Sequence, residues 1–371
     1  MKITVSKTEL ANILAKAATV TETKATMPIL SAVLLEVRED GPGPYIDQVA
    51  VRAYDLEVAY VGYITAEVAK KGRVAVNAKT LGDVVKGLPE ASVTLSVEKN
   101  RLVVTSGGVE FRLGILPAEE YPALPETVHG IDFPIVGSTL AQVLGRVAYA
   151  QSTDETRYSL NGTLLEATDG VVQATATDGH RLVHSGVRAE VPDFKGIILS
   201  RKTTKLLRTL FAGLDYLVIV SVSENAITVA SAAGETVTAR LIDGSFPDYA
   251  AIYPETKAKS TLDVKELSAV LGRTKLVGEA TTWKVGGGTV RFRAFDPDLG
   301  EVEDWMAHGG DAPEITFGLN GTYVREALSV VTGGTVNVFF PADELTPVVF
   351  RYPGLSDDLE DYAIVMPMRV K

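Results

Sequence analysis

The sequence predicts an α+β protein made of three tandem copies of one small domain, each with two helices and antiparallel strands. Two observations support this. Amphipathic helical stretches recur at roughly equal intervals along the 371 residues, and alternating apolar strands lie between them. The repeat is longer than a solenoid unit of about 20–50 residues, so each copy is a whole domain. We place the copies at residues 1–129, 130–256 and 257–371.

The first helix of each copy is predicted from apolar residues spaced for one buried face. These residues are Leu10, Ile13, Leu14 and Ala17 in copy one, Leu140, Val143, Leu144 and Val147 in copy two, and Leu267, Val270 and Leu271 in copy three. Ser6 followed by Glu9 forms a capping-box pattern, which places the start of the first helix at this point.

The second helix of each copy follows a short apolar strand. Its apolar positions are Leu81, Val84, Val85 and Leu88, then Leu206, Leu207, Leu210 and Phe211, then Val324, Ala327, Leu328 and Val331. This second helix and the strands after it carry the repeat most clearly.

Each copy then ends in paired apolar strands. The predicted pairs are 93–97 with 101–105, 217–222 with 226–229, and 335–340 with 347–352. The joints between copies are expected near 125–133 and 254–261, which are rich in proline, charge or small residues.

Composition narrows the class of protein. Hydrophobic residues make up 46% and charged residues 22%, which is typical of a globular chain. No apolar run reaches the roughly 18 residues of a membrane span, and the start reads as a strand, so we expect neither a membrane segment nor a signal peptide. Cysteine is absent, which excludes disulfides and thiolate chemistry and fits a cytoplasmic protein. The net charge of −11 argues against a generally basic surface.

Charge is unevenly distributed, because the polar faces of the predicted helices lean basic. The basic residues there are Lys7, Lys16, Lys79, Lys86, Arg146, Arg201, Lys202, Lys205, Arg208, Lys265, Arg273, Lys275 and Arg325. Two interpretations stay open: ordinary solvated charges, or a face that meets a polyanion through contacts that are independent of base sequence.

The string from Thr175 to Leu182 looks the most like a catalytic motif, with a strand, an Asp-Gly turn and a His-Arg pair. Asp178 and His180 could act as a general base or a nucleophile dyad. His180 and His184 are four residues apart, but no glutamate follows as in a zinc-binding helix, and the region alternates like a strand. The sequence also has no phosphate loop or nucleophile elbow, so we expect neither catalysis nor a metal site here.

Six segments in order resemble motifs of one family. They are 27–30 (Met-Pro-Ile-Leu), 54–57 (Tyr-Asp-Leu-Glu), 157–162 (Arg-Tyr-Ser-Leu-Asn-Gly), 175–182, 241–249 (Leu-Ile-Asp-Gly-Ser-Phe-Pro-Asp-Tyr) and 365–370 (Val-Met-Pro-Met-Arg-Val). Together they resemble the beta subunit of bacterial DNA polymerase III, the beta sliding clamp, and the resemblance spans the whole chain.

The resemblance implies a fold and a function. Each copy would be a DNA-clamp domain with two helices against two antiparallel sheets, and two chains would close head to tail into a homodimeric ring around double-stranded DNA. Such a clamp has no catalytic site and no cofactor, and it confers processivity on the polymerase through topology. Its implied partners are the polymerase III alpha subunit, the clamp-loader delta subunit, translesion polymerases, mismatch-repair proteins and ligase, in the cytoplasm at the nucleoid and away from membranes.

The resemblance also implies two sets of site residues. Facing DNA would be Lys24, Arg157, Tyr158, Arg201, Lys202 and Lys205. A pocket for a partner peptide of the type Gln-x-x-Leu-Phe would include Leu160, Thr177, Gly179, His180, Arg181, Leu182, Pro247, Ile252, Leu276, Asn320, Tyr323, Leu345, Pro347, Ile364, Met366, Pro367, Met368 and Arg369. Leucine, proline and methionine make an adaptable apolar floor for such a peptide.

Four positions depart from the family pattern, namely Ser159, Ala251, Leu276 and Pro347. A housekeeping clamp and a specialised paralogue therefore both stay open. Two further hypotheses are an enzyme that uses Asp178 and His180, and a peptide-binding scaffold that has lost DNA binding.

Overall fold

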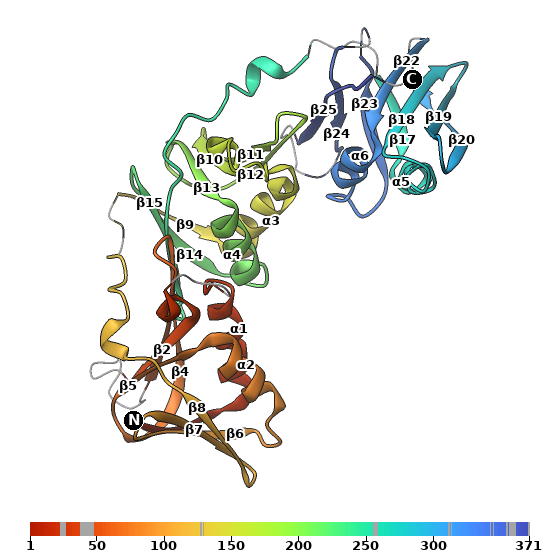
Figure 1. Cartoon of the computed structure of the whole chain (residues 1–371). Helices are drawn as coiled ribbons and strands as arrows, with labels where there is room; N and C mark the ends of the chain where they lie inside the picture. The colour runs from red at the N-terminus through yellow and green to blue at the C-terminus, as the bar shows by residue number, and fades with distance from the viewer. Residues whose placement is uncertain are drawn as a thin grey trace. The chain divides into compact units, whose positions relative to one another are not determined.

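The computed structural model describes residues 1–22, 27–37, 48–126, 128, 130–254, 259–310, 312, 314–341, 343, 345–353, 355 and 361–369. Within these ranges the chain forms the two helices per copy that the sequence predicts (Figure 1). They are α1 (Lys7–Ala18), α2 (Ala78–Gly87), α3 (Gly137–Val147), α4 (Arg201–Phe211), α5 (Val264–Thr274) and α6 (Gly321–Leu328).

All strand pairs in the described part of the chain are antiparallel. Copy one contributes β1 (Lys2–Ser6), β2 (Ala32–Val37), β3 (Gln48–Tyr54), β4 (Val58–Lys70), β5 (Arg73–Asn77), β6 (Ser92–Glu98), β7 (Arg101–Ser106) and β8 (Val109–Gly114). Copy two contributes β9 (Ile131–Val136), β10 (Gly162–Thr168), β11 (Val171–Thr177), β12 (Arg181–Arg188), β13 (Phe194–Ser200), β14 (Leu217–Val222), β15 (Ala226–Ser231) and β16 (Thr236–Arg240).

Copy three contributes β17 (Lys259–Asp263), β18 (Ala280–Gly286), β19 (Thr289–Asp296), β20 (Gly300–Ala307), β21 (Gly309–Gly310), β22 (Ile315–Asn320), β23 (Thr335–Phe339), β24 (Val348–Arg351) and β25 (Tyr362–Val365). The three predicted pairs are confirmed as β6 with β7, β14 with β15, and β23 with β24.

The chain divides into two compact units that follow the sheets. Unit 1 is Met1–Ala141 with Lys202–Leu241, and unit 2 is Gln142–Arg201 with Ile242–Lys371. Unit 1 holds one sheet in the order β8-β7-β6-β1-β4-β16-β15-β14-β9, extended by β2, β3 and β5. Unit 2 holds the sheets β13-β10-β11-β12-β25-β24-β23-β17-β21 and β20-β19-β18-β22. The copy boundaries drawn from the sequence repeat stay a prediction.

Strands of neighbouring copies pair within each unit. In unit 1, β4 pairs with β16, so that Tyr60 lies opposite Val237. Beside this pair, the Glu235 carboxylate accepts a hydrogen bond from the buried Tyr60 hydroxyl (2.9 Å). It also forms an ion pair with Lys16 (2.5 Å). In unit 2, β12 pairs with β25, and Leu182 lies opposite Ile364. The hydrogen-bonded backbone therefore joins copy one to copy two and copy two to copy three.

Side-chain caps define the helix starts. The Ser6 hydroxyl accepts from the Glu9 backbone N–H (3.4 Å), as the capping-box pattern predicts, and Asp263 accepts from Glu266 (2.8 Å) at the start of α5. The apolar pattern of the last helix runs one turn too far, because α6 ends at Leu328. The chain then bends into a glycine pair before β23, with Gly334 at a φ of +85°.

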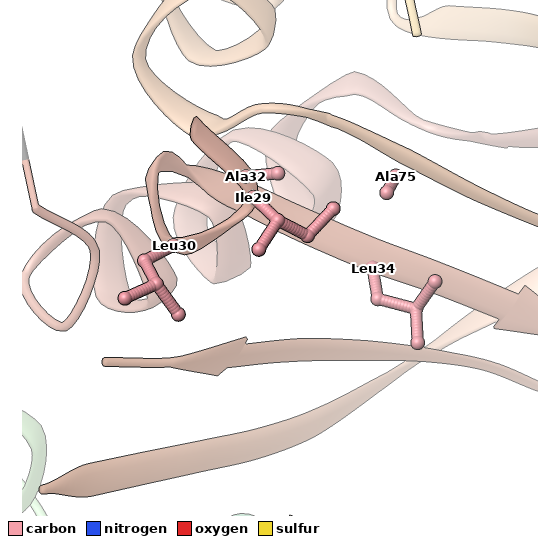
Figure 2. Packing of buried hydrophobic residues seen from close by; sticks show 5 residues of the cluster. All are labelled: Ile29, Leu30, Ala32, Leu34 and Ala75. Atoms are coloured by element: carbon pink, nitrogen blue, oxygen red, sulfur yellow. The ribbon is translucent and has the colours of Figure 1, made fainter. Parts of the chain in front are cut away.

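The motif at residues 27–30 is a packing element of copy one. Pro28–Ser31 forms a short 3-10 turn that leads into β2. Figure 2 shows its apolar side chains within one buried cluster, which consists of Ile29, Leu30, Ala32, Leu34 and Ala75. Proline at the first turn needs no N–H partner, so the turn can start there at little cost.

An aromatic core fills copy three. Trp283 on β18 is fully buried. Its ring centroid lies 4.7 Å from Phe292, 5.9 Å from Phe317 and 6.4 Å from Phe350. These partners come from β19, β22 and β24, so the indole connects the two sheets of unit 2.

We expect Trp283→Ala to lower the free energy of unfolding of unit 2 by about 3–5 kcal/mol, because the change leaves a cavity in a packed core. Phe295→Ala is the control, since Phe295 is an aromatic residue of unit 2 that is 57% exposed, and it should cost under about 0.5 kcal/mol. Urea unfolding followed by circular dichroism measures both. Equal midpoints for the two variants would contradict the assigned core.

Candidate functional site

The most conspicuous string of the sequence forms a tightly bonded hairpin turn. Thr177 ends β11 and Arg181 begins β12. The buried Thr177 hydroxyl accepts from the Gly179 N–H (3.1 Å) and donates to the Arg181 carbonyl (2.6 Å). Asp178 Oδ1 accepts from the N–H groups of His180 (2.9 Å) and Arg181 (3.0 Å). Gly179 has a φ of +87°, which a residue with a Cβ adopts only under strain, so the turn favours glycine.

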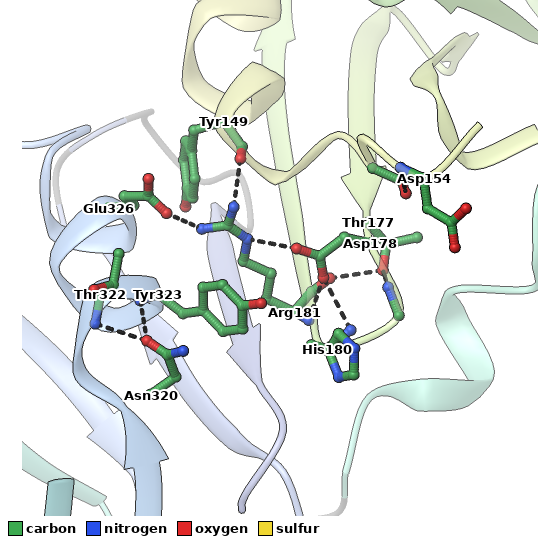
Figure 3. A network of polar contacts seen from close by, with 12 residues as sticks. Tyr149, Asp154, Thr177, Asp178, His180, Arg181, Asn320, Thr322, Tyr323 and Glu326 are labelled. Atoms are coloured by element: carbon green, nitrogen blue, oxygen red, sulfur yellow. Dashed lines mark hydrogen bonds and ion pairs between the residues drawn. The ribbon is translucent and has the colours of Figure 1, made fainter. Parts of the chain in front are cut away.

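Arg181 is the centre of a polar network in unit 2 (Figure 3). Its Nε donates to Asp178 Oδ2 (3.1 Å), its Nη2 donates to the Tyr149 carbonyl (2.7 Å), and its Nη1 pairs with Glu326. The guanidinium carbon also lies 4.4 Å from the centroid of the Tyr323 ring. Only 9% of the residue is exposed, so Arg181 joins the hairpin to α6 from within.

Helix α6 presents its first turn to this hairpin. Asn320 caps the helix, and its side-chain oxygen accepts from the N–H groups of Thr322 (2.9 Å) and Tyr323 (3.2 Å). Burial raises the pKa of the Tyr323 hydroxyl. The His180 ring lies on the same side of the network, with its centroid 6.5 Å from that of Tyr323 and the planes 21° apart.

The segment after β25 is bonded to the hairpin 177–182 and to strand β22. The Met366 N–H donates to the His180 carbonyl (2.9 Å), and the Met368 N–H donates to the Gly318 carbonyl on β22 (2.9 Å). The two methionines are 37% and 38% exposed. Two flexible apolar side chains, those of Met366 and Met368, are therefore held at the surface by the hairpin and by β22.

An aromatic stack holds the segment that carries Pro247 and Ile252. The His184 ring lies between Tyr249 (centroids 5.4 Å apart) and Tyr362 (5.1 Å), and Tyr253 packs edge-on against Tyr362 (5.0 Å). The Tyr249 hydroxyl donates to Glu166 (2.6 Å). Burial lowers the pKa of His184 to about 4, so the ring is neutral at physiological pH.

The other predicted pocket residues have different environments. Leu182 and Ile364 lie inside a core cluster with Val349 and Tyr362, 2% and 1% exposed, so they support the site from beneath. Leu160 and Pro347 are partly buried. Pro247, Leu276, Leu345 and Arg369 are exposed residues outside helices and strands, and Ile252 is exposed at the end of the short 3-10 helix Ala250–Ile252. The hydrogen bonds described above join the hairpin, α6 and residues 366–368.

Tyr149 and Glu326 contact Arg181 but belong to neither set of site residues expected from the sequence. Tyr149 lies in a short 3-10 turn after α3, and Glu326 lies on α6. Their partner Arg181 is 32 and 145 residues away in the chain, so no local spacing could indicate these contacts.

The predicted DNA-facing residues fall into two groups. Arg157, Tyr158, Arg201 and Lys205 are exposed, although Arg157 also donates to the Asp178 carbonyl (3.0 Å). Lys202 is instead bound to the buried Asp55 and to the Val20 carbonyl within unit 1. Lys24 lies outside the described residues.

The basic character of the helix faces needs one correction. Arg146 is 8% exposed, donates to the Leu355 carbonyl (2.9 Å) and lies 3.7 Å from Asp361. It is therefore an internal ion-pair residue, because its position on α3 turns toward strand β12 rather than toward solvent. Lys16 and Arg273 also have acidic partners, Glu235 and Asp304.

Between α5 and α6 lies a cavity of about 580 Å³ with a cationic lining. Lys265, Lys275 and Arg325 contribute three positive charges, and Glu326 is the one acidic residue among the lining residues described. A groove with this charge suits phosphate groups.

Family models match most of the first two copies. The model for the N-terminal domain of the DNA polymerase III beta subunit matches residues 1–125, and the model for its central domain matches residues 135–248. The beta sliding clamps of Pseudomonas aeruginosa and Caulobacter vibrioides are 30% and 28% identical to the chain, each over 100% of both proteins. The chain belongs to the bacterial beta sliding clamp family.

Solved clamp structures agree over the full length. The beta subunit structures from Pseudomonas aeruginosa and Thermotoga maritima have TM-scores of 0.90 and 0.92, with 28% and 25% identity and 100% coverage of both chains. The chain is thus a DNA sliding clamp of the DNA polymerase III system, a processivity factor and not an enzyme.

Asp178, the most catalytic-looking residue of the 175–182 string, has all its acceptor oxygens in structural hydrogen bonds. Both carboxylate oxygens of Asp178 are occupied by the turn and by Arg181, so this group has a structural role. Within the described residues, no group of three or more metal-ligating side chains comes together. In the same part of the chain, no helix combines the length and apolar character needed to cross a bilayer.

The neutral His184 predicts a pH dependence for unit 2. An unfolded histidine has a pKa near 6.5, whereas the folded one has a pKa of about 4. The unfolded chain therefore binds the proton first, and stability falls by up to about 1.4 kcal/mol per pH unit as pH decreases from 6.5 toward 4. Urea midpoints at about pH 7.5 and about pH 5 should differ less in His184→Phe than in the parent clamp.

Leu299→Ala is the control, because Leu299 is an exposed residue of unit 2 without a titratable group, so its variant should keep the parent's pH dependence. If His184→Phe showed the full difference between the two pH values, another group would be responsible.

Proposed function

We propose that this clamp binds partner proteins through a peptide site made of the hairpin 177–182, the start of α6 and residues 366–368. The observation that carries the proposal is the pair of backbone hydrogen bonds from Met366 to His180 and from Met368 to Gly318. They hold two partly exposed methionines beside the hairpin, whose turn is itself hydrogen-bonded within unit 2.

The chemistry of this surface suits a short peptide with a leucine and an aromatic residue. Methionine side chains adapt to the shape of an apolar ligand. Ile252 and Leu345, which the family resemblance assigns to the same site, are exposed apolar residues, and His180 and Asn320 supply polar groups that can fix orientation. The same proposal includes the other pocket residues that the family resemblance implies, among them Leu160, Pro247, Leu276, Pro347, Pro367 and Arg369.

We further propose that exposed cations on the helices contact the duplex that the ring encircles. The residues are Lys79, Lys86, Arg201, Lys205, Arg208, Lys265, Lys275 and Arg325, with Arg157 and Tyr158 on a neighbouring loop. Such contacts hold phosphate without reading bases, which allows sliding. Because Lys202 is bound to Asp55, we assign it mainly to the stability of unit 1.

Ring closure requires a second copy, and two edge strands suit that contact. Strand β8 ends the sheet of unit 1 and β20 ends the small sheet of unit 2. Each carries a partly exposed aromatic residue, Phe111 (38%) and Trp305 (63%). Open edges with exposed apolar side chains favour pairing with another chain. We therefore propose a head-to-tail homodimer in which β8 of one chain meets β20 of the other.

The proposed partners are the polymerase III alpha subunit and the clamp-loader delta subunit, followed by translesion polymerases, mismatch-repair proteins and ligase. All would compete for the peptide site at the nucleoid in the cytoplasm. The tether raises the effective concentration of each enzyme at DNA.

The topological function has a direct test. A clamp loaded by a bacterial clamp loader onto nicked circular DNA should stay bound through gel filtration, and cutting the circle should release it. Retention after cutting would contradict encirclement. A chain that binds the peptide but is not retained on circles would instead be a scaffold without DNA binding.

The peptide site is tested by changing its methionines. The double variant Met366→Ala, Met368→Ala should bind a fluorescent peptide that contains Gln-Ala-Ala-Leu-Phe about tenfold or more weaker than the parent clamp, because apolar contact is lost. A tenfold loss of affinity corresponds to about 1.4 kcal/mol of binding free energy. Met27→Ala is the control, since Met27 is half exposed and lies in unit 1. Unchanged affinity in the double variant by fluorescence anisotropy would refute the site.

A further inference from the structure

The geometry points to Arg181 and Glu326 as positioning residues of the peptide site, which fix the Tyr323 ring as a rigid wall without touching the peptide. The inference rests on the peptide site proposed above. The family resemblance makes Arg181 a pocket residue, whereas we assign it a positioning role. Arg181 would act through Tyr323, and Glu326 would act through Arg181.

The protein holds the guanidinium of Arg181 at all three of its nitrogens. Each of its three nitrogens has a partner, namely Asp178 Oδ2, Glu326 Oε2 and the Tyr149 carbonyl. The side chain is 9% exposed. A side chain this buried presents little surface to a peptide, so Arg181 would act through its neighbours and not by direct contact.

The face of the same guanidinium is used as well. Its central carbon lies 4.4 Å from the Tyr323 ring centroid and 5.4 Å from that of Tyr149. A cation over an aromatic face attracts the ring and limits its rotation. Because Asn320 fixes the backbone N–H of Tyr323, both ends of this residue are held.

Glu326 completes the arrangement from the next turn of α6. It lies three residues after Tyr323, so both side chains project from one face of the helix. Its side chain is 44% exposed and reaches the cationic cavity between α5 and α6 on its other side. Glu326 can therefore be changed with little disturbance of the core, whereas its removal frees one end of the Arg181 guanidinium.

A preset ring lowers the entropic cost of binding, because the ligand does not have to immobilise it. Loss of the ion pair should thus appear mainly as faster dissociation of the peptide. A ring free to rotate can still be contacted, so binding should weaken without being abolished.

The test uses Glu326→Gln in the full-length clamp with the fluorescent peptide that contains Gln-Ala-Ala-Leu-Phe. We expect an affinity about three- to tenfold weaker, with the change in the dissociation rate, and a melting temperature within about 2 °C of the parent. The matched control is Glu266→Gln, an exposed glutamate on α5, which should bind like the parent.

A double-mutant cycle separates positioning from a general structural effect. In a Tyr323→Ala background, Glu326→Gln should cause no further loss, because the ring through which it acts is gone. The same fold-loss in both backgrounds would overturn the inference, as would affinity within twofold of the parent for Glu326→Gln alone.

A conservative variant covers the case in which Glu326→Gln lowers the melting temperature. Glu326→Asp keeps the negative charge and should recover most of the affinity, and failure to recover it would count against the inference. If the parent clamp did not bind the peptide, or if the methionine double variant bound normally, the proposed peptide site itself would be wrong.

Discussion

Antiparallel pairing between β12 and β25 is the constraint on which the candidate site depends. It places His184 opposite Tyr362 and continues into the hydrogen bond from Met366 to the His180 carbonyl. A backbone ladder of this kind fixes register to one residue, since a slip would turn every side chain to the opposite face. The methionines of the last segment are therefore beside the hairpin because of strand pairing, and side-chain contacts refine a position already set.

Residues of one chemical type have two different roles in this clamp. Arg181 and Arg146 are buried and paired with carboxylates, where loss of a partner would leave an uncompensated charge. Exposed cations such as Lys265 and Arg325 have no acidic ion-pair partner among the described residues. Burial and pairing, not residue type, separate the internal ion pairs from the exposed cations that we propose as DNA contacts.

Much of the fold could be predicted because its signals are local. The apolar spacing from Leu10 to Ala17 and the cap at Ser6 both act within a few residues, and both correspond to α1. The end of α6 was misplaced, since the apolar residue Val331 continues the helical spacing after the helix has stopped. The proposed peptide site comes from family resemblance, whereas the contacts of Arg181 with Tyr149 and Glu326 could not be predicted because they link distant parts of the chain.

The sequence by itself determined the threefold repeat, the two helices of each copy and the family, because periodicity and ordered motifs are properties of consecutive residues. Only the tertiary structure decided which charges are free. Lys202 and Lys205 are three residues apart on α4, yet Asp55 binds the first and the second is exposed. The reason is that Asp55 comes from a distant strand end that packs beside one side of the helix, and no spacing within α4 can encode that neighbour.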